Sequence, residues 1–228
     1  QTVTGVQTCA LPIYSIPGDV RVGIYNITVK NEFGSDMEYH ALDVVDEIDD
    51  DFKFVHLTDI HTGYAENGGS IPNIKETVRE VNLIDPDFVV ITGDVCDKVY
   101  SWWDDQEPPP TEQDRKFIQL IMGLKVPVYV GSGNHDWSYD DKSDPGQNIE
   151  SFKRWIHPSL NFTFDYADSH FTFFNSRSYV SDTNSDSVMK NLSWLEDDLS
   201  SNMGKENRFV LMHHPAYPDT IDDDTVRD

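Results

Sequence analysis

Residues 52–61 read FKFVHLTDIH, and this stretch decides the fold. It is a short apolar run of strand-forming residues that ends in polar ones. The same form returns three times along the chain, in PDFVVITGDV (86–95), PVYVGSGNHD (127–136) and NRFVLMHHP (207–215). Apolar residues at helical spacing lie between the runs, at residues 71–85 and 111–123. Strands that alternate with helices predict an α/β layered fold.

Residues able to bind metal stand directly at the end of each of these four runs. They are Asp59 and His61, Asp94, Asn134 and His135, and His213 and His214. Ligands of α/β sheets bind beyond the carboxyl ends of the strands, so we expect these side chains to meet on one rim. Carboxylate, imidazole and amide ligands without thiolate suit Fe, Mn or Zn, and one central Asp can bridge two ions.

These motifs, in this order, resemble the calcineurin-like metallophosphoesterases. The family pattern is D-x-H, G-D-x-x-D, G-N-H-D/E and a strand-end His, followed by G-H-x-H. The chain has Asp59-Ile60-His61, then Gly93-Asp94-Val95-Cys96-Asp97, then Gly133-Asn134-His135-Asp136, then His213-His214. The resemblance covers residues 53–228 and implies a layered β-sandwich core flanked by helices. It also implies two divalent or trivalent metal ions, with Fe, Mn or Zn left open.

The resemblance further implies a role for each motif residue. The first metal would be bound by Asp59 and His61, the second by Asn134 and His213, and both by Asp94. His135 would face the substrate and assist the leaving group, and Asp136 would fix the ring of His135. We therefore expect a phosphoric ester hydrolase in which metal-bound hydroxide attacks phosphorus. Its substrate would be a small phosphate ester, with monoester and diester both open.

One family motif, G-H-x-H, does not occur in the chain. In the family it supplies one His to each metal, so the site as written is two ligands short. Every earlier motif is intact, and we therefore expect that the sequence is truncated before this motif. As given, the chain should be inactive or weakly active.

The residues before the phosphoesterase-like region have a different pattern. Alternating apolar and polar positions predict a strand up to the turn residues 31–35, and YHALDVV (39–45) predicts a second strand. Two strands are not stable alone, so we interpret residues 14–47 as the end of a small all-β, Ig-like domain. Residues 48–52 are the charged linker that follows it. Such modules precede extracytoplasmic members of the family, which favours an extracellular or cell-surface location.

The first 13 residues differ again. Residues 3–13 read VTGVQTCALPI, and a DNA sequence that encodes them resembles a widely used high-throughput sequencing adapter. The last T of that adapter must begin the next codon, and both codons of Tyr14 begin with T. We therefore interpret residues 1–13 as translated adapter. Removing Cys9 leaves one cysteine, Cys96, which we expect to be a packing residue rather than a nucleophile.

Composition narrows the possible partners. The chain of 228 residues has 41 acidic and 17 basic residues and a net charge of −24, a balance that repels nucleic acid. No apolar run is long enough to span a membrane, and the oligomeric state is left open. The alternative to an enzyme is a non-catalytic cell-surface binding protein that retains the phosphoesterase scaffold.

Overall fold

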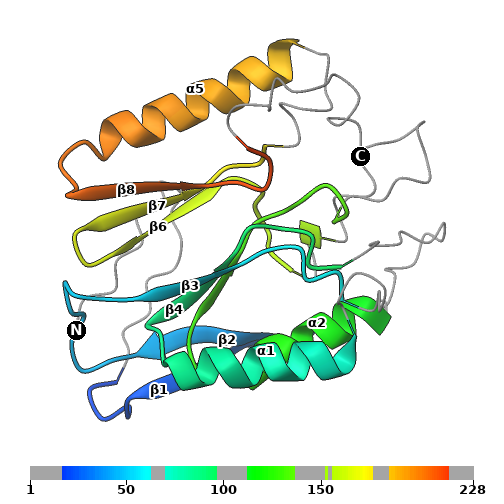
Figure 1. Ribbon diagram of the computed structural model, residues 1–228. Coiled ribbons are helices and arrows are strands. Elements are labelled where there is room, and N and C mark those ends of the chain that lie inside the picture. Colours follow the sequence, from blue (N-terminus) through cyan, green and yellow to red (C-terminus); the bar gives the residue numbers. More distant parts are fainter. Residues whose placement is uncertain are drawn as a thin grey trace.

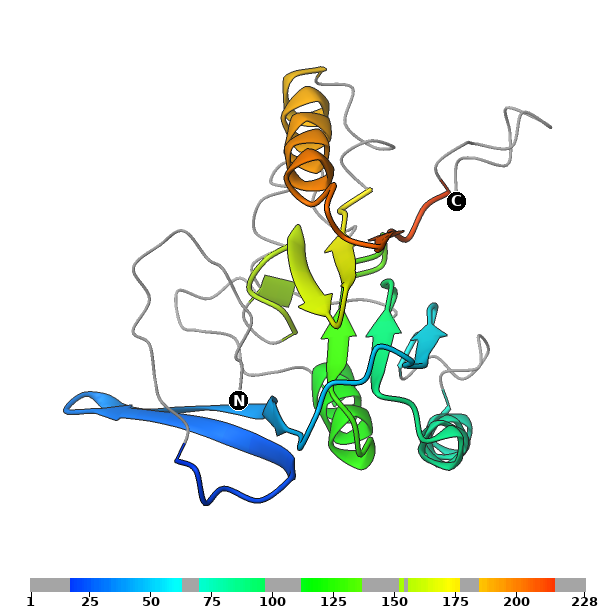
Figure 2. The same ribbon diagram turned by 90° about the vertical axis from the view of Figure 1, so that its left-hand side faces the viewer.

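The computed structural model describes residues 17–62, 70–96, 112–136, 152–153, 156–176 and 185–215. Two three-stranded sheets face each other in the region after residue 52, and helices cover their outer faces (Figure 1). The view in Figure 2 shows α5 above the second sheet and α1 and α2 below the first. The predicted α/β layered fold is therefore confirmed at the level of mixed sheets and helices.

The first sheet is parallel, with β4 (Phe88–Ile91) between β3 (Phe54–Leu57) and β5 (Val128–Val130). All four residues of β4 are buried because both faces of this strand are covered. Side chains alternate along a strand. Phe88 and Val90 join the core between the two sheets, whereas Val89 and Ile91 join the core under the helices.

The second sheet holds β6 (Phe162–Tyr166), β7 (Ser169–Phe173) and β8 (Asn207–Leu211), with β7 in the middle. β7 is antiparallel to β6 and parallel to β8. Its inward residues meet the first sheet through aromatic contacts. The rings of Phe88 and Phe171 lie 5.3 Å apart at 86°, an edge-to-face arrangement that aromatic pairs favour.

Helices α1 (Ile71–Ile84) and α2 (Glu112–Gly123) cover the first sheet. The Ser70 side chain accepts a hydrogen bond from the backbone N–H of Asn73, and a proline stands in the first turn of α1. Asp85 ends the helix in the left-handed conformation, and its N–H returns to the carbonyl of Val81. These local signals explain why the α1 segment begins and ends where the sequence predicts.

Polar side chains hold α5 (Ser185–Ser201) on the outer face of the second sheet. Nδ1 of His170, on β7, lies 2.6 Å from Oδ1 of Asp165, and Nε2 lies 3.1 Å from Oδ2 of Asp198 on the helix. The hydroxyl of Thr172 donates to the same oxygen of Asp198 at 2.7 Å. Lys205, just after the helix, pairs with Asp165 at 3.0 Å.

The N-terminal strands form an antiparallel hairpin of β1 (Gly23–Asn31) and β2 (Gly34–Val44). The predicted second strand is confirmed, but it begins at Gly34 rather than Tyr39, so the turn is shorter than the predicted span 31–35. The Asn31 side chain accepts the N–H groups of Phe33 and Gly34 and closes a shorter turn. An Ig-like domain and a truncated C-terminus stay predictions.

No helix among the described residues has both the length and the apolar character needed to cross a membrane.

Candidate metal centre

The loops that follow β3 and β4 bring three potential metal ligands together. One ligand atom from each of Asp59, His61 and Asp94 can be chosen so that all lie within 4.8 Å of one another. Nε2 of His61 lies 3.7 Å from a carboxylate oxygen of Asp59 and 3.7 Å from Oδ2 of Asp94. Asp59 is exposed, whereas His61 and Asp94 are buried. The cluster is thus open to solvent on the Asp59 side.

Asp94 also faces a second group of potential ligands. Nε2 of His213, just after β8, lies 3.4 Å from Oδ2 of Asp94. The same nitrogen lies 2.9 Å from Oδ1 of Asn134, in the loop after β5. One oxygen of Asp94 is therefore close to the imidazoles of both His61 and His213.

His135 lies at the same place. Its backbone N–H donates to Oδ1 of Asp94 at 2.8 Å, and its ring meets the ring of His61 at 4.8 Å and 83°. The residue is half-buried, so its imidazole remains accessible from the rim. The structure thus brings the five predicted metal ligands and His135 into one cluster.

Burial and charge act against each other on the Asp94 and His213 pair. Burial alone would raise the pKa of Asp94, but hydrogen bonding and the charge of His213 hold it below its ordinary value. Burial alone would lower the pKa of His213, but Asp94 holds it above its ordinary value. The pair therefore favours an ionised Asp94, the form that binds metal.

Asp136 is fully buried, and its two carboxylate oxygens accept four backbone N–H groups. These belong to Asp94, Val95, Cys96 and Gly133. Four donors use the lone pairs of both oxygens, so the carboxylate holds the main chain of these loops. The predicted role of Asp136 in fixing the ring of His135 stays a prediction. Burial raises the pKa of Asp136 to about 7, although the N–H groups act to lower it.

The loops after β3 and β4 continue the parallel pairing beyond the strands. The N–H groups of Asp59, His61 and Thr62 donate to the carbonyls of Gly93, Asp94 and Val95 at 3.1, 2.9 and 3.0 Å. Asp59, His61 and Asp94 all have positive φ, at 54°, 45° and 53°. Non-glycine residues adopt this conformation at a cost of about 1–3 kcal/mol each, and it clusters at functional sites.

The donor set fits metal ions. Two carboxylates, two imidazoles and an amide oxygen converge on one space, with Asp94 shared, and this mixture suits Fe, Mn or Zn. Nδ1 of His213 is buried without a hydrogen-bond partner among the described residues, while the Nε2 atoms of His61 and His213 face the cluster. The rings are therefore oriented with Nε2 as the metal-facing nitrogen.

Ser176 contacts the loop that carries His213, and no motif in the sequence predicts this contact. Ser176 lies three residues beyond β7, and its hydroxyl accepts the backbone N–H of His214 at 3.0 Å. The same hydroxyl lies 2.9 Å from Nδ1 of His214. These contacts hold the loop that carries His213, and only the position of Ser176 after a strand could have indicated them. Asp97 lies outside the described residues.

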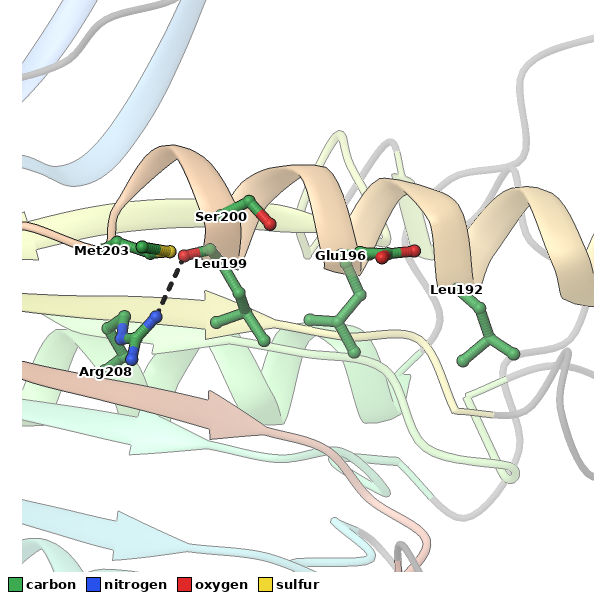
Figure 3. Close-up of a pocket in the computed structure, with 7 residues that line it drawn as sticks. Leu192, Glu196, Leu199, Ser200, Met203 and Arg208 are labelled. Atoms are coloured by element: carbon green, nitrogen blue, oxygen red, sulfur yellow. Dashed lines mark hydrogen bonds between the residues drawn. The ribbon is translucent and has the colours of Figure 1, made fainter.

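A separate cavity of about 340 Å³ lies between α5 and β8. Its walls are mainly apolar, and Figure 3 shows the Arg208 guanidinium donating to the carbonyl of Leu199 at one end. The lining residues are Leu192, Leu195, Glu196, Leu199, Ser200, Met203 and Arg208. None of them belongs to the metal-binding cluster, so this cavity is not part of that site.

Comparison with known proteins identifies the family. The model of the calcineurin-like phosphoesterases matches residues 52–228. Among solved structures, a purple acid phosphatase from yellow lupin (Lupinus luteus) seeds is similar, with 16% identity and a TM-score of 0.49. The similarity covers 70% of this chain and 30% of that one. A dimetal phosphatase from Danio rerio has 13% identity and a TM-score of 0.46, over 73% of this chain and 71% of that one.

A search of curated proteins found no match. The assignment rests on the family model, which matches well over half of the chain and includes all four motif loops. The chain belongs to the calcineurin-like phosphoesterase family.

Proposed function

We propose that the protein hydrolyses small phosphate esters at a dinuclear metal centre on the rim formed by the four motif loops. The observation that carries this proposal is the position of Oδ2 of Asp94. It lies 3.7 Å from Nε2 of His61 and 3.4 Å from Nε2 of His213. A carboxylate this close to imidazoles from two loops is placed to be shared by two ions.

The ligands divide into two groups around Asp94. Asp59 and His61 would hold one ion, Asn134 and His213 the other, and Asp94 both. When bound, the ions supply Lewis-acid activation of water and of the phosphoryl oxygens. Asp59 is the most exposed member, so the substrate would approach from its side of the cluster.

His135 is the best-placed proton donor. Its ring packs against that of His61, and it is half-buried rather than enclosed. An imidazole near neutral pH can donate a proton to the leaving oxygen, a contribution of about 10²- to 10⁴-fold in rate. The net charge of −24 also disfavours polyanions, in keeping with a small substrate. An extracellular location stays a prediction.

The test is hydrolysis of aryl phosphate mono- and diesters with Mn²⁺, Zn²⁺ or Fe²⁺ added singly. It is run on the 228-residue chain and on any longer natural form that supplies a G-H-x-H motif. Asp94→Asn should abolish metal-dependent turnover, and His135→Ala should lower kcat by about 10²- to 10⁴-fold.

The matched control is His157→Ala. His157 is also half-buried, but it contacts Ser159 and the ring of Phe162 away from the cluster. Its removal should leave kcat within about twofold of the unsubstituted protein. A protein that binds these ions through Asp94 and hydrolyses neither ester would contradict the proposal and favour a non-catalytic binding role.

A further inference from the structure

We propose that Asp136 is a positioning residue that sets the place of the Asp94 carboxylate by holding the main chain of two motif loops. This inference rests on the proposed function, since the Asp94 carboxylate is the ligand shared by both metals there. Asp136 itself does not face the metal-binding cluster with a spare oxygen. Its action would pass through the backbone of the residues that it binds.

The carboxylate of Asp136 accepts backbone hydrogen bonds from two loops. Oδ2 of Asp136 accepts the N–H of Asp94 at 2.8 Å and the N–H of Gly133 at 2.7 Å. These two amides belong to the loops after β4 and β5. Oδ1 accepts from Val95 and Cys96 at 3.0 and 3.4 Å. A single buried carboxylate therefore joins both loops, and its bonds to Asp94 and Gly133 are as short as those expected for a charged acceptor.

The main chain of Asp94 is itself bonded to the loop that holds His61. Asp94 has a φ of 53°, a conformation that a non-glycine residue keeps only when its surroundings impose it. Its carbonyl accepts the N–H of His61 at 2.9 Å, and the next pair joins Thr62 to Val95. A shift of the Asp94 main chain would thus move the loop that carries His61 as well.

The side chain of Asp94 fits closely against Gly133. A Cβ built on Gly133 would lie 2.1 Å from Oδ1 of Asp94, so the carboxylate occupies the space left by the missing side chain. The N–H of His135 donates to that same oxygen. One oxygen is thereby fixed by the β5 loop, and Oδ2 is left facing His61 and His213. Asp136 holds both sides of this contact, through Asp94 and through Gly133.

The experiment measures Mn²⁺ affinity by titration calorimetry, together with amide hydrogen exchange in the metal-free protein. In Asp136→Asn, one oxygen becomes an NH₂ group that cannot accept, so two of the four amides lose their partner. We expect Mn²⁺ affinity to fall by about 10- to 100-fold, the usual effect of losing a group that orients a metal ligand. Exchange should accelerate at least about tenfold at the two amides that lose their acceptor, either Asp94 and Gly133 or Val95 and Cys96.

The matched control is Asp198→Asn, which makes the same change in a carboxylate that Thr172 and His170 hold away from the site. It should lower stability but leave Mn²⁺ affinity within about twofold. Asp136→Glu keeps two acceptor oxygens and should bind Mn²⁺ more tightly than Asp136→Asn. Comparing these variants separates positioning from a general loss of stability.

The inference is overturned if Asp136→Asn binds Mn²⁺ within twofold of the unsubstituted protein. It is also overturned if Asp198→Asn loses as much affinity, or if Asp136→Glu binds no better than Asp136→Asn. An unsubstituted protein that binds Mn²⁺ without hydrolysing esters contradicts the proposed function alone. If that protein binds no Mn²⁺, the amide exchange decides: acceleration confined to the two loops supports positioning, and its absence overturns it.

Discussion

Gly93 and Gly133 lie so close together that a Cβ built on Gly93 would stand 2.2 Å from the backbone nitrogen of Gly133. Gly93 also has a φ of 116°, which side chains rarely tolerate. The contact joins the ends of β4 and β5 directly beneath the Asp94 carboxylate. Two motif glycines are therefore required by the close approach of two backbones.

Gly93→Ala should lower the free energy of unfolding by about 3 kcal/mol, because strain and a steric clash add at one position. Urea denaturation followed by fluorescence measures this. Gly204→Ala is the control, since a Cβ there meets nothing within 4 Å. The control should change stability by no more than about 1 kcal/mol. Equal effects of the two substitutions would contradict the steric argument.

The aromatic core between the sheets yields a second prediction. Phe171 is fully buried and stacks on Phe164 and Phe209 at 4.8 and 4.7 Å while meeting Phe88 edge-on. Phe171→Ala should cost about 3–5 kcal/mol, from lost burial and the cavity left behind. The exposed Phe33 serves as the control, and its replacement by Ala should cost under about 0.5 kcal/mol. If thermal or urea unfolding shows equal losses of stability for Phe171→Ala and Phe33→Ala, the proposed packing of Phe171 in the aromatic core is contradicted.

The rim was predictable from the sequence because it depends on local pattern alone. Apolar runs such as FVVI fix the strands, and the residue after each strand must lie at its carboxyl end. One point could not be read in this way. His213 follows β8, which pairs with β7 in the second sheet and not with β3, β4 or β5. The site therefore spans the rims of both sheets.

The role of Asp136 was also beyond the sequence. Three of its four main-chain partners, Asp94, Val95 and Cys96, lie 40 to 42 positions away in the sequence. Any residue type except proline can supply a main-chain amide, so a sequence motif does not reveal such a contact. The hairpin shows the same limit at short range. The side-chain oxygen of Asn31 accepts two backbone N–H groups and closes a shorter turn than the composition predicts. Contacts to the backbone, rather than side-chain pairs, account for these differences.

Cys96 provides a third prediction, about reactivity. Cys96 is fully buried in the loop after β4, where its backbone forms an isolated β-bridge with Thr62. We therefore expect an inert thiol. In a Cys9→Ser background, a disulfide reagent should modify Cys96 at least about a hundredfold more slowly in buffer than in urea. The reason is that local unfolding around the buried thiol limits the reaction in buffer. Cys96→Ser should cost about 1–3 kcal/mol by placing a hydroxyl in an apolar site. Rapid labelling of the folded protein would contradict the packing role.

The last prediction concerns acid stability and Asp165. Partial burial alone would raise the pKa of Asp165, but hydrogen bonds from His170 and Lys205 bring it below the ordinary value of 3.8. The unfolded chain therefore takes up the proton first as the pH falls, so the stabilisation is complete above about pH 4 and is lost as the pH drops through the folded-state pKa. Asp165→Asn should be less stable than the unsubstituted protein by about 1 kcal/mol at pH 5, with the gap closing towards pH 3. Urea denaturation at a series of pH values measures the gap, with the exposed Asp197→Asn on α5 as control. A gap that stays constant down to pH 2.5 would show that the carboxylate of Asp165 gains nothing from its partners.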